Sequence, residues 1–352
     1  MRKLSYCMLA GIALSAFPPI ADNPAYAGST ESRIGTEIPT QDPRNVSDPE
    51  KLTERTPGHL VKDLHAVFGE HHARAVHAKG TILEGFFMPS LQARRASSSE
   101  LFKASTPVIV RFSNFTGLPS IPDTEPHGQP RGFAVKFLLR DGSNYDVVSH
   151  SFNGFPSPTA ADFGDLLQAI AASGETASKP TALDAYLGSH PVAKQFLTTQ
   201  TPPPESWATS AYYGVNAFEF TDKNNKAIYV RYRFVPAAGE HDLDAATLAR
   251  QSDNYLSEEI ERRVERAPIA FTWYAQIAEP GDAIADPSVP WPETRRLIEL
   301  GVVTLDRMGP NTPLADKSLL FLPGTTPPGI GVADPMLTIR NAAYPTSFAE
   351  RQ

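Results

Sequence analysis

The chain has 352 residues, with 32 Lys and Arg against 39 Asp and Glu, so its formal net charge is −7. Its apolar content of 41% is typical of a globular protein and excludes wholesale disorder. One cysteine cannot form a disulfide within its own chain, and the sequence has no apolar run of about 18 residues that could span a membrane. Because nucleic acids select basic surfaces, we expect neither nucleic acid nor a membrane as a partner.

The first 27 residues have the layout of a bacterial secretory signal peptide. Arg2 and Lys3 precede a short apolar stretch, residues 4–20, and the small-x-small segment 25–27 follows. An N-terminal anchor helix is the alternative, but the stretch is short and interrupted by prolines. Cleavage would remove Cys7 and leave no cysteine, which suits an oxidising compartment. We therefore expect residues 1–27 to be removed and the mature protein to be periplasmic.

The predicted elements of the mature chain begin with a polar segment, 28–56, whose prolines fit an extended arm or a disordered linker equally well. Leu60, Leu64 and Val67 recur at helical spacing and predict a helix over 58–70. After His77 the pattern changes to strands. We expect two helices between 160 and 198 and a charged surface helix over 244–267. The assigned strands are 107–113, 132–139, 145–148, 218–220, 227–234, 269–277, 297–305 and 318–322.

The strand pattern indicates an α+β protein whose strands pair mostly antiparallel. Asp141-Gly142 and Asn224-Asn225 are typical of hairpin turns between neighbouring strands. A sheet of seven or eight antiparallel strands tends to close into a barrel, since closure removes exposed edges. No glycine-rich phosphate loop follows a strand, so nucleotide binding has no support.

Two short segments carry candidate chemistry. Arg74 and His77 place a cation and an imidazole three residues apart at a helix-to-strand transition. Arg340 and Tyr344 lie four residues apart and share one face of a helix. A guanidinium beside a phenol favours the phenolate, and a tyrosinate can ligate haem iron. On spacing alone, however, such a pair is more often a solvated helix face.

Residues 57 to 351 resemble the haem-catalase superfamily, and particularly its minimal members, the catalase-related peroxidases. The matching motifs occur in family order: Arg74-x-x-His77-Ala-Lys-Gly80, Val110-Arg-Phe-Ser113, Arg131-Gly-Phe-Ala-Val-Lys-Phe137, Tyr213-Gly, Trp291-Pro, Pro327-Pro-Gly-Ile330 and Arg340-x-x-x-Tyr344-Pro345. The resemblance implies one catalase-like haem-binding domain over 57–352. Its core would be an eight-stranded antiparallel β-barrel with inserted and flanking helices, without a C-terminal flavodoxin-like domain.

The resemblance also implies a haem b, with its iron between a proximal tyrosine and a distal histidine. Tyr344 would be the iron ligand, and Arg340 would hold it ionised. His77 would be the distal base that takes a proton from peroxide and delivers it to the departing oxygen. Ser113 would hydrogen-bond the imidazole and fix its orientation.

Further residues follow from the same family pattern. Arg74, Arg111 and Arg351 would pair with the two haem propionates, which require cations. Phe155 would lie over the haem and Phe163 in the substrate channel, although core packing accounts for Phe163 equally well.

The sequence departs from the catalase pattern at several points. His150 stands where catalases have the asparagine that polarises peroxide, and Asn153 comes three residues late. Asn216 replaces a histidine linked to the proximal arginine. The chain ends eight residues after Tyr344, so we expect no wrapping domain, no NADPH site and a more accessible haem.

These departures favour a haem peroxidase over an efficient catalase. The expected substrates are hydrogen peroxide or organic hydroperoxides, with small organic reductants as electron donors and weak residual catalase activity. The alternatives are a true monofunctional catalase, a hydroperoxide-rearranging enzyme such as an allene oxide synthase, and a haem-binding or haem-sensing protein without turnover. The sequence leaves the oligomeric state open.

Overall fold

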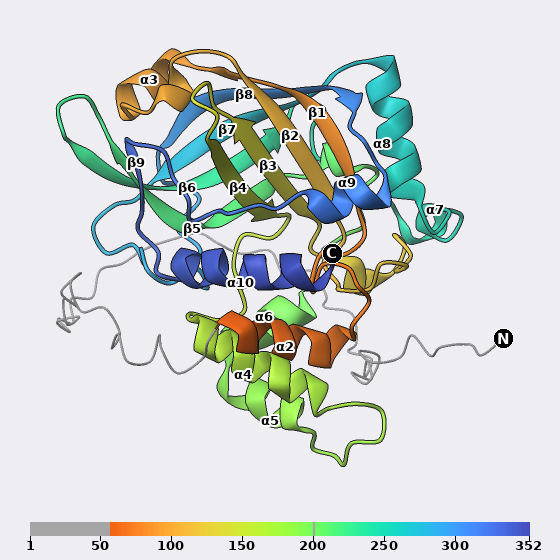
Figure 1. Ribbon diagram of the computed structural model, residues 1–352. Coiled ribbons are helices and arrows are strands. Elements are labelled where there is room, and N and C mark those ends of the chain that lie inside the picture. Colours follow the sequence, from red (N-terminus) through yellow and green to blue (C-terminus); the bar gives the residue numbers. More distant parts are fainter. Residues whose placement is uncertain (1–56, 200) are drawn as a thin grey trace, which may run out of the picture.

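The computed structural model describes residues 57–199 and 201–352 (Figure 1). The predicted signal peptide 1–27 and arm 28–56 lie outside the described residues. Within the described part of the chain, no helix combines the length and the apolar character needed to cross a membrane.

Eight antiparallel strands close into a barrel, as the sequence predicts. Their order is β4-β3-β2-β1-β8-β7-β6-β5, and a pairing of β4 with β5, at His150 and Tyr213, closes the ring. A short strand, β9, pairs antiparallel with β5. The strands are β1 Gly80–Pro89, β2 Thr106–Ser113, β3 Gly132–Leu138, β4 Asn144–His150, β5 Tyr212–Thr221, β6 Ala227–Pro236, β7 Ile269–Ile277, β8 Leu297–Met308 and β9 Ile330–Val332.

Aromatic side chains fill the interior of the barrel. Along β7, Ile269, Phe271, Trp273 and Ala275 are buried while the residues between them are half-buried, which is the two-residue period of a strand with one inward face. The Phe133 ring lies 4.9 Å from the ring of Phe271. Since side chains occupy the lumen, a cofactor cannot lie inside the barrel and has to lie at one end.

Helices cover one end of the barrel in two layers. Figure 1 shows α10 lying across the end of the barrel, with α2, α4, α5 and α6 in a layer on its far side. The other helices lie around the barrel wall. The helices are α2 Pro57–Phe68, α3 Leu91–Ala96, α4 Ala160–Ala171, α5 Ala182–Ser189, α6 Pro191–Thr198, α7 Ala245–Leu248, α8 Tyr255–Arg266, α9 Pro313–Ser318 and α10 Met336–Glu350, with 3-10 turns at Glu100–Phe102, Pro126–Gly128 and Trp207–Thr209.

The structure corrects three predicted elements. The region 160–198 forms three helices, because Thr181 caps the start of α5 and Pro191 begins α6. The region 244–267 forms two helices, α7 and α8, and the backbone carbonyl of Asp253 between them accepts a hydrogen bond from Lys79.

The third correction concerns the strand predicted at 318–322, which is wrong. This segment pairs with no strand, and side chains bind its backbone: Arg74 and Arg351 donate to the Leu319 carbonyl, and the Leu322 N–H donates to Asp146. The remaining barrel strand is β1, in the region after His77 where the sequence changes to a strand pattern.

Truncating a central ring should destabilise the barrel strongly. Phe133 packs against four aromatic rings, those of Phe112, Tyr212, Phe234 and Phe271. Phe133→Ala should lower the free energy of unfolding by about 3–5 kcal/mol, because it leaves a cavity in a rigid core. Urea unfolding measures the loss, with the exposed Leu91→Ala as control. A loss below about 1 kcal/mol would show that the barrel is not held by these rings.

Candidate functional site

His77 and Ser113 form a fixed pair at one end of the barrel. Ser113 is the last residue of β2, and its Oγ lies 3.0 Å from Nδ1 of His77. A Cβ at Gly132 would lie 2.4 Å from this oxygen and 2.7 Å from this nitrogen, so only glycine fits there. Phe115 packs edge-to-face on the imidazole at 5.5 Å. The hydrogen bond implied by the family resemblance is therefore present, and it leaves Nε2 as the free ring nitrogen.

Burial keeps the imidazoles of His77 and His150 neutral. Burial, together with nearby His150, Arg111 and Arg340, lowers the pKa of His77 to about 3. Burial likewise lowers the pKa of His150 to about 4, with a contribution from Arg340. At neutral pH both rings can therefore accept or donate a hydrogen bond without carrying a charge.

His150 has two buried ring nitrogens that lack a hydrogen-bond partner of good geometry among the described residues. It ends β4, and its backbone lies opposite Gly132 in the neighbouring strand. Buried polar groups almost always have partners, so this pair of nitrogens is available to a partner from outside residues 57–199 and 201–352. Asn153 does not take the place of His150 in the site, because the Asn153 side chain donates to Glu293 at the surface.

On the other side of the site, Arg340 holds the phenol of Tyr344. Both residues lie on α10, and Arg340 donates from Nη2 and Nε to the phenolic oxygen at 2.6 and 3.1 Å. Its Nη1 donates to Asn216 Oδ1 at 2.6 Å, and Asn216 Nδ2 donates to Asp334 at 2.7 Å. Two donated bonds from an anchored guanidinium fix the position of this phenolic oxygen.

Asp334 is a site residue that the sequence analysis missed. It is fully buried, and burial raises its pKa above the ordinary value. Its other carboxylate oxygen accepts the N–H of Met336, the first residue of α10. An acidic residue just before a helix was the available sequence signal, but nothing in the sequence links it to Asn216.

The two sides of the site come from opposite ends of the described chain and meet here. The backbone N–H of Ala75 donates to Ser347 Oγ at 3.2 Å, which ties the segment before His77 to α10 just beyond Tyr344. Arg340, which bonds Tyr344, is also near enough to act electrostatically on both His77 and His150. The structure therefore brings the candidate distal and proximal groups into one site.

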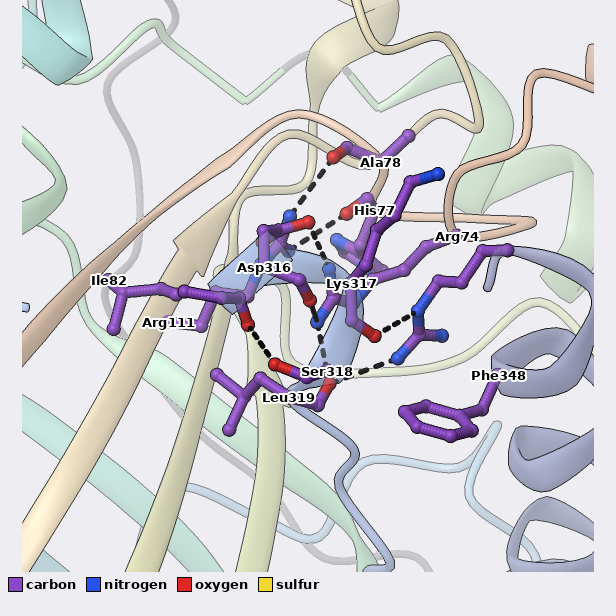
Figure 2. A network of polar contacts seen from close by, with 12 residues as sticks. Arg74, His77, Ala78, Ile82, Arg111, Asp316, Lys317, Ser318, Leu319 and Phe348 are labelled. Atoms are coloured by element: carbon purple, nitrogen blue, oxygen red, sulfur yellow. Dashed lines mark hydrogen bonds and ion pairs between the residues drawn. The ribbon is translucent and has the colours of Figure 1, made fainter. Parts of the chain in front are cut away.

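Three arginines gather beside this site around residues 316–319, and Figure 2 shows Arg74 and Arg111 next to Asp316. Arg74 and Arg111 both bind Asp316, the latter at 2.6 Å, and Arg351 donates to the carbonyls of Lys317 and Leu319 at 3.0 Å each. Sequence reasoning had no signal for Asp316, because its partners lie more than 200 positions away in the chain.

The arginine cluster holds more positive charge than Asp316 offsets. Burial and the neighbouring Arg111 lower the pKa of Arg74 to about 8, and burial lowers that of Arg351 to about 10. Burial opposes ionisation of Asp316, but Arg111 and Arg74 outweigh it and lower its pKa. Three guanidiniums against one carboxylate leave two positive charges to be matched by a ligand.

These residues fit an iron porphyrin that carries two carboxylates. The phenol fixed by Arg340 offers an oxygen ligand, His77 offers a neutral imidazole in the same site, and the arginine cluster has the excess charge to hold two propionates. Phe155 lies among the rings of Phe163 and Phe196, at 5.0 and 6.4 Å, so its contact with a cofactor stays a prediction.

Comparison with known proteins agrees with this fold. The sequence model of the Catalase family matches residues 60–352, and the chain belongs to that family of haem enzymes. It is similar to two proteins named "Catalase-related peroxidase". The one from Mycolicibacterium paratuberculosis is 34% identical over 84% of this chain and 95% of its own length. The one from Synechococcus elongatus is 30% identical over 84% and 88%. These similarities place the protein among peroxide-acting oxidoreductases.

Larger catalases share the fold over part of their length. Catalase-2 of Bacillus subtilis is 28% identical over 77% of this chain and 42% of its own length. A fungal catalase structure superposes with a TM-score of 0.70 at 22% identity, covering 79% of this chain and 59% of the other. A bacterial catalase structure gives a TM-score of 0.68 at 23% identity, covering 79% and 57%.

The two neutral imidazoles predict a loss of stability in acid. Their folded-state pKa values lie below the ordinary 6.5, so unfolding takes up protons. Their contribution is fully present above pH 6.5 and is lost as the pH falls toward 4 and 3. Between pH 7 and 5, urea unfolding of the apoprotein should lose about 3 kcal/mol more than the double variant His77→Gln/His150→Gln. Exposed His241→Gln is the control; equal pH slopes in all three proteins would contradict neutral burial.

Removing the carboxylate of Asp316 should destabilise the apoprotein. Asp316→Asn removes the carboxylate that pairs with the guanidiniums of Arg74 and Arg111. Because Asp316 is 31% exposed, we expect a loss of about 2 kcal/mol rather than the larger cost of a fully buried pair. Asp306→Asn, whose partner Arg307 is 61% exposed, should cost under about 0.5 kcal/mol. Equal losses in the two variants would mean that the cluster needs no counter-charge.

Proposed function

We propose that this protein is a haem b peroxidase, which reduces hydrogen peroxide or organic hydroperoxides with electrons from small organic donors and has weak catalase activity. The observation that carries the proposal is that two buried imidazoles share the site. Ser113 holds His77, and the ring nitrogens of His150 lack a partner of good geometry among the described residues. The 34% and 30% identical relatives named "Catalase-related peroxidase" support it.

The chain's own residues handle the proton of the peroxide. With a proton on Nδ1 donated to Ser113 Oγ, the Nε2 lone pair of His77 is free to accept the hydroperoxyl proton. The same nitrogen then returns the proton to the departing oxygen, which leaves as water or an alcohol. His150, neutral and unpartnered, can hydrogen-bond the second oxygen.

The remaining residues hold the cofactor. Tyr344 would ligate the iron through the phenolic oxygen that Arg340 hydrogen-bonds, and Arg74, Arg111 and Arg351 would bind the propionates. The haem, when bound, supplies the redox chemistry that cleaves the O–O bond. Two donor molecules, each losing one electron and one proton, convert one hydrogen peroxide to two waters.

His150 favours the peroxidase over the catalase alternative. A catalase has to orient a second peroxide molecule on the same site, where the family pattern supplies an asparagine amide. An imidazole is bulkier, and its two nitrogens lie at other positions than the amide's oxygen and nitrogen. We further propose that a signal peptide, 1–27, directs the protein to the periplasm and that no NADPH, nucleic acid or membrane takes part.

The test measures oxygen release and donor oxidation on the same haem-loaded protein. The wild type should oxidise donor faster than it releases oxygen, and His150→Asn should shift the ratio toward oxygen. His77→Ala should retain its haem spectrum but lose about 10²–10⁴-fold in rate, because it lacks the base.

Three outcomes would contradict the proposal. Vigorous oxygen evolution with little donor oxidation would favour a true catalase. Peroxide consumption no faster than with free hemin would favour a non-enzymatic haem-binding protein. An unchanged rate in His77→Ala would remove His77 from the mechanism.

A further inference from the structure

The backbone of His77 has a conformation that residues with a side chain adopt only occasionally. Its φ is +58°, in the left-handed region. Such a conformation persists where the surrounding structure fixes it, and it is found most often where the direction of a side chain matters to function. The direction of the His77 imidazole therefore depends on the groups that hold its backbone.

Three backbone hydrogen bonds tie residues 77–79 to residues 114–116. They are 2.9, 2.9 and 3.0 Å long, and the N–H of His77 itself donates one of them, to the Phe115 carbonyl. Residues 114–116 directly follow Ser113, whose hydroxyl meets the imidazole. The position of residues 114–116 thus sets both the backbone and the hydrogen-bond partner of the candidate base.

One buried carboxylate oxygen accepts a hydrogen bond from each of these two segments. Asp123 Oδ1 lies 2.7 Å from the donating Nδ2 of Asn114 and 2.8 Å from Nζ of Lys79. Asn114 and Asp123 are both 0% exposed. The Lys79 ammonium also donates to the carbonyls of Ile121 and Asp253, at 2.9 and 2.7 Å. Asp123 therefore joins residues 77–79 to residues 114–116 through their side chains.

The carboxylate of Asp123 is itself fixed from two further directions. Its Oδ2 accepts the N–H of Leu256 in α8 at 3.0 Å, and its own N–H donates to the Asp253 carbonyl at 2.8 Å. Buried Arg131 donates to the Asp123 carbonyl at 2.7 Å and to Asn114 Oδ1. Asp123 is thus held against α8 and can serve as a rigid anchor.

We propose that Asp123 is a positioning residue for the distal base. It holds residues 77–79 and 114–116 together, so that the His77 imidazole keeps its Nδ1 proton on Ser113 and leaves Nε2 free to accept a proton. The inference rests on the proposed peroxidase function and adds a residue that acts through other residues rather than on the peroxide.

The arrangement requires a carboxylate at position 123. Its two oxygens accept from three donors, which are the Asn114 amide, the Lys79 ammonium and the Leu256 N–H. An asparagine has a single acceptor oxygen, so its own NH₂ group would face at least one of these donors. Asp123→Asn therefore keeps the size of the side chain but releases one of the groups that it anchors.

Two-dimensional ¹H–¹⁵N NMR of the imidazoles tests the positioning in the apoprotein, without haem. The wild type should show His77 as one neutral tautomer with its proton on Nδ1. Asp123→Asn should show both neutral tautomers, because a loosened ring loses its contact with Ser113. The control is Asp282→Asn, which removes another mostly buried carboxylate, 5% exposed, from Arg295. It should leave the His77 signals unchanged.

Ligand binding to the haem-loaded protein then tests whether this position matters for proton transfer. HCN has to give its proton to a base when its carbon binds ferric iron, whereas nitric oxide carries no proton. Asp123→Asn should slow HCN association about tenfold or more and leave nitric oxide association within about twofold. Asp282→Asn should change neither rate. A site that is merely disrupted would change both rates alike.

Circular dichroism checks that each variant is folded. If Asp123→Asn does not fold, Asn114→Ala decides the question by the same two measurements, because it removes the amide that links Asp123 to residues 114–116.

An unchanged His77 tautomer in the folded variant overturns the proposal. An unchanged HCN rate, or equal slowing of HCN and nitric oxide, also overturns it while the peroxidase function stands. If the wild type binds HCN no faster than His77→Ala, the proposed function fails, and the His77 tautomer in the apoprotein still decides whether Asp123 positions the ring.

Discussion

The contact on which the site depends is the pair of hydrogen bonds from Arg340 to the phenolic oxygen of Tyr344. An exposed arginine and tyrosine at this spacing contribute little, but here the guanidinium is anchored on its other side by Asn216. Asn216 belongs to β5 and is itself held by Asp334, just before α10. These hydrogen bonds thus fix α10 to the barrel and hold the phenolic oxygen of Tyr344 in one position.

The packed interior of the barrel explains why chemistry is found only at its end. With aromatic rings filling the lumen, the groups free to meet a ligand are those at strand ends, Ser113 on β2 and His150 on β4, together with His77 before β1. The helices add what the barrel lacks. α10 supplies the phenol, and α9 with the residue after it supplies the carboxylate and carbonyls that hold the arginines. α2, α4 and α6 surround an apolar cavity.

Local patterns predicted most of the barrel, because strands with one buried face alternate strictly, as β7 does. They failed where side chains take over backbone hydrogen bonds, as at 318–322, and where caps divide a helical region, as at Thr181 and Pro191. The family resemblance pointed to His77, Ser113, Arg340 and Tyr344. It could not predict the roles of Asp316 and Asp334 or the packing of Phe115 on His77, since these depend on contacts between segments far apart in the chain.

The central claim is that Tyr344 ligates haem iron, and titration of the apoprotein with hemin tests it most directly. The account predicts that the wild type binds one hemin with a distinct ferric absorption spectrum. Tyr344→Phe should change that spectrum and weaken binding about tenfold or more, while Tyr229→Phe, at an exposed tyrosine, leaves both unchanged. The same spectrum and affinity in Tyr344→Phe as in the wild type would contradict the account.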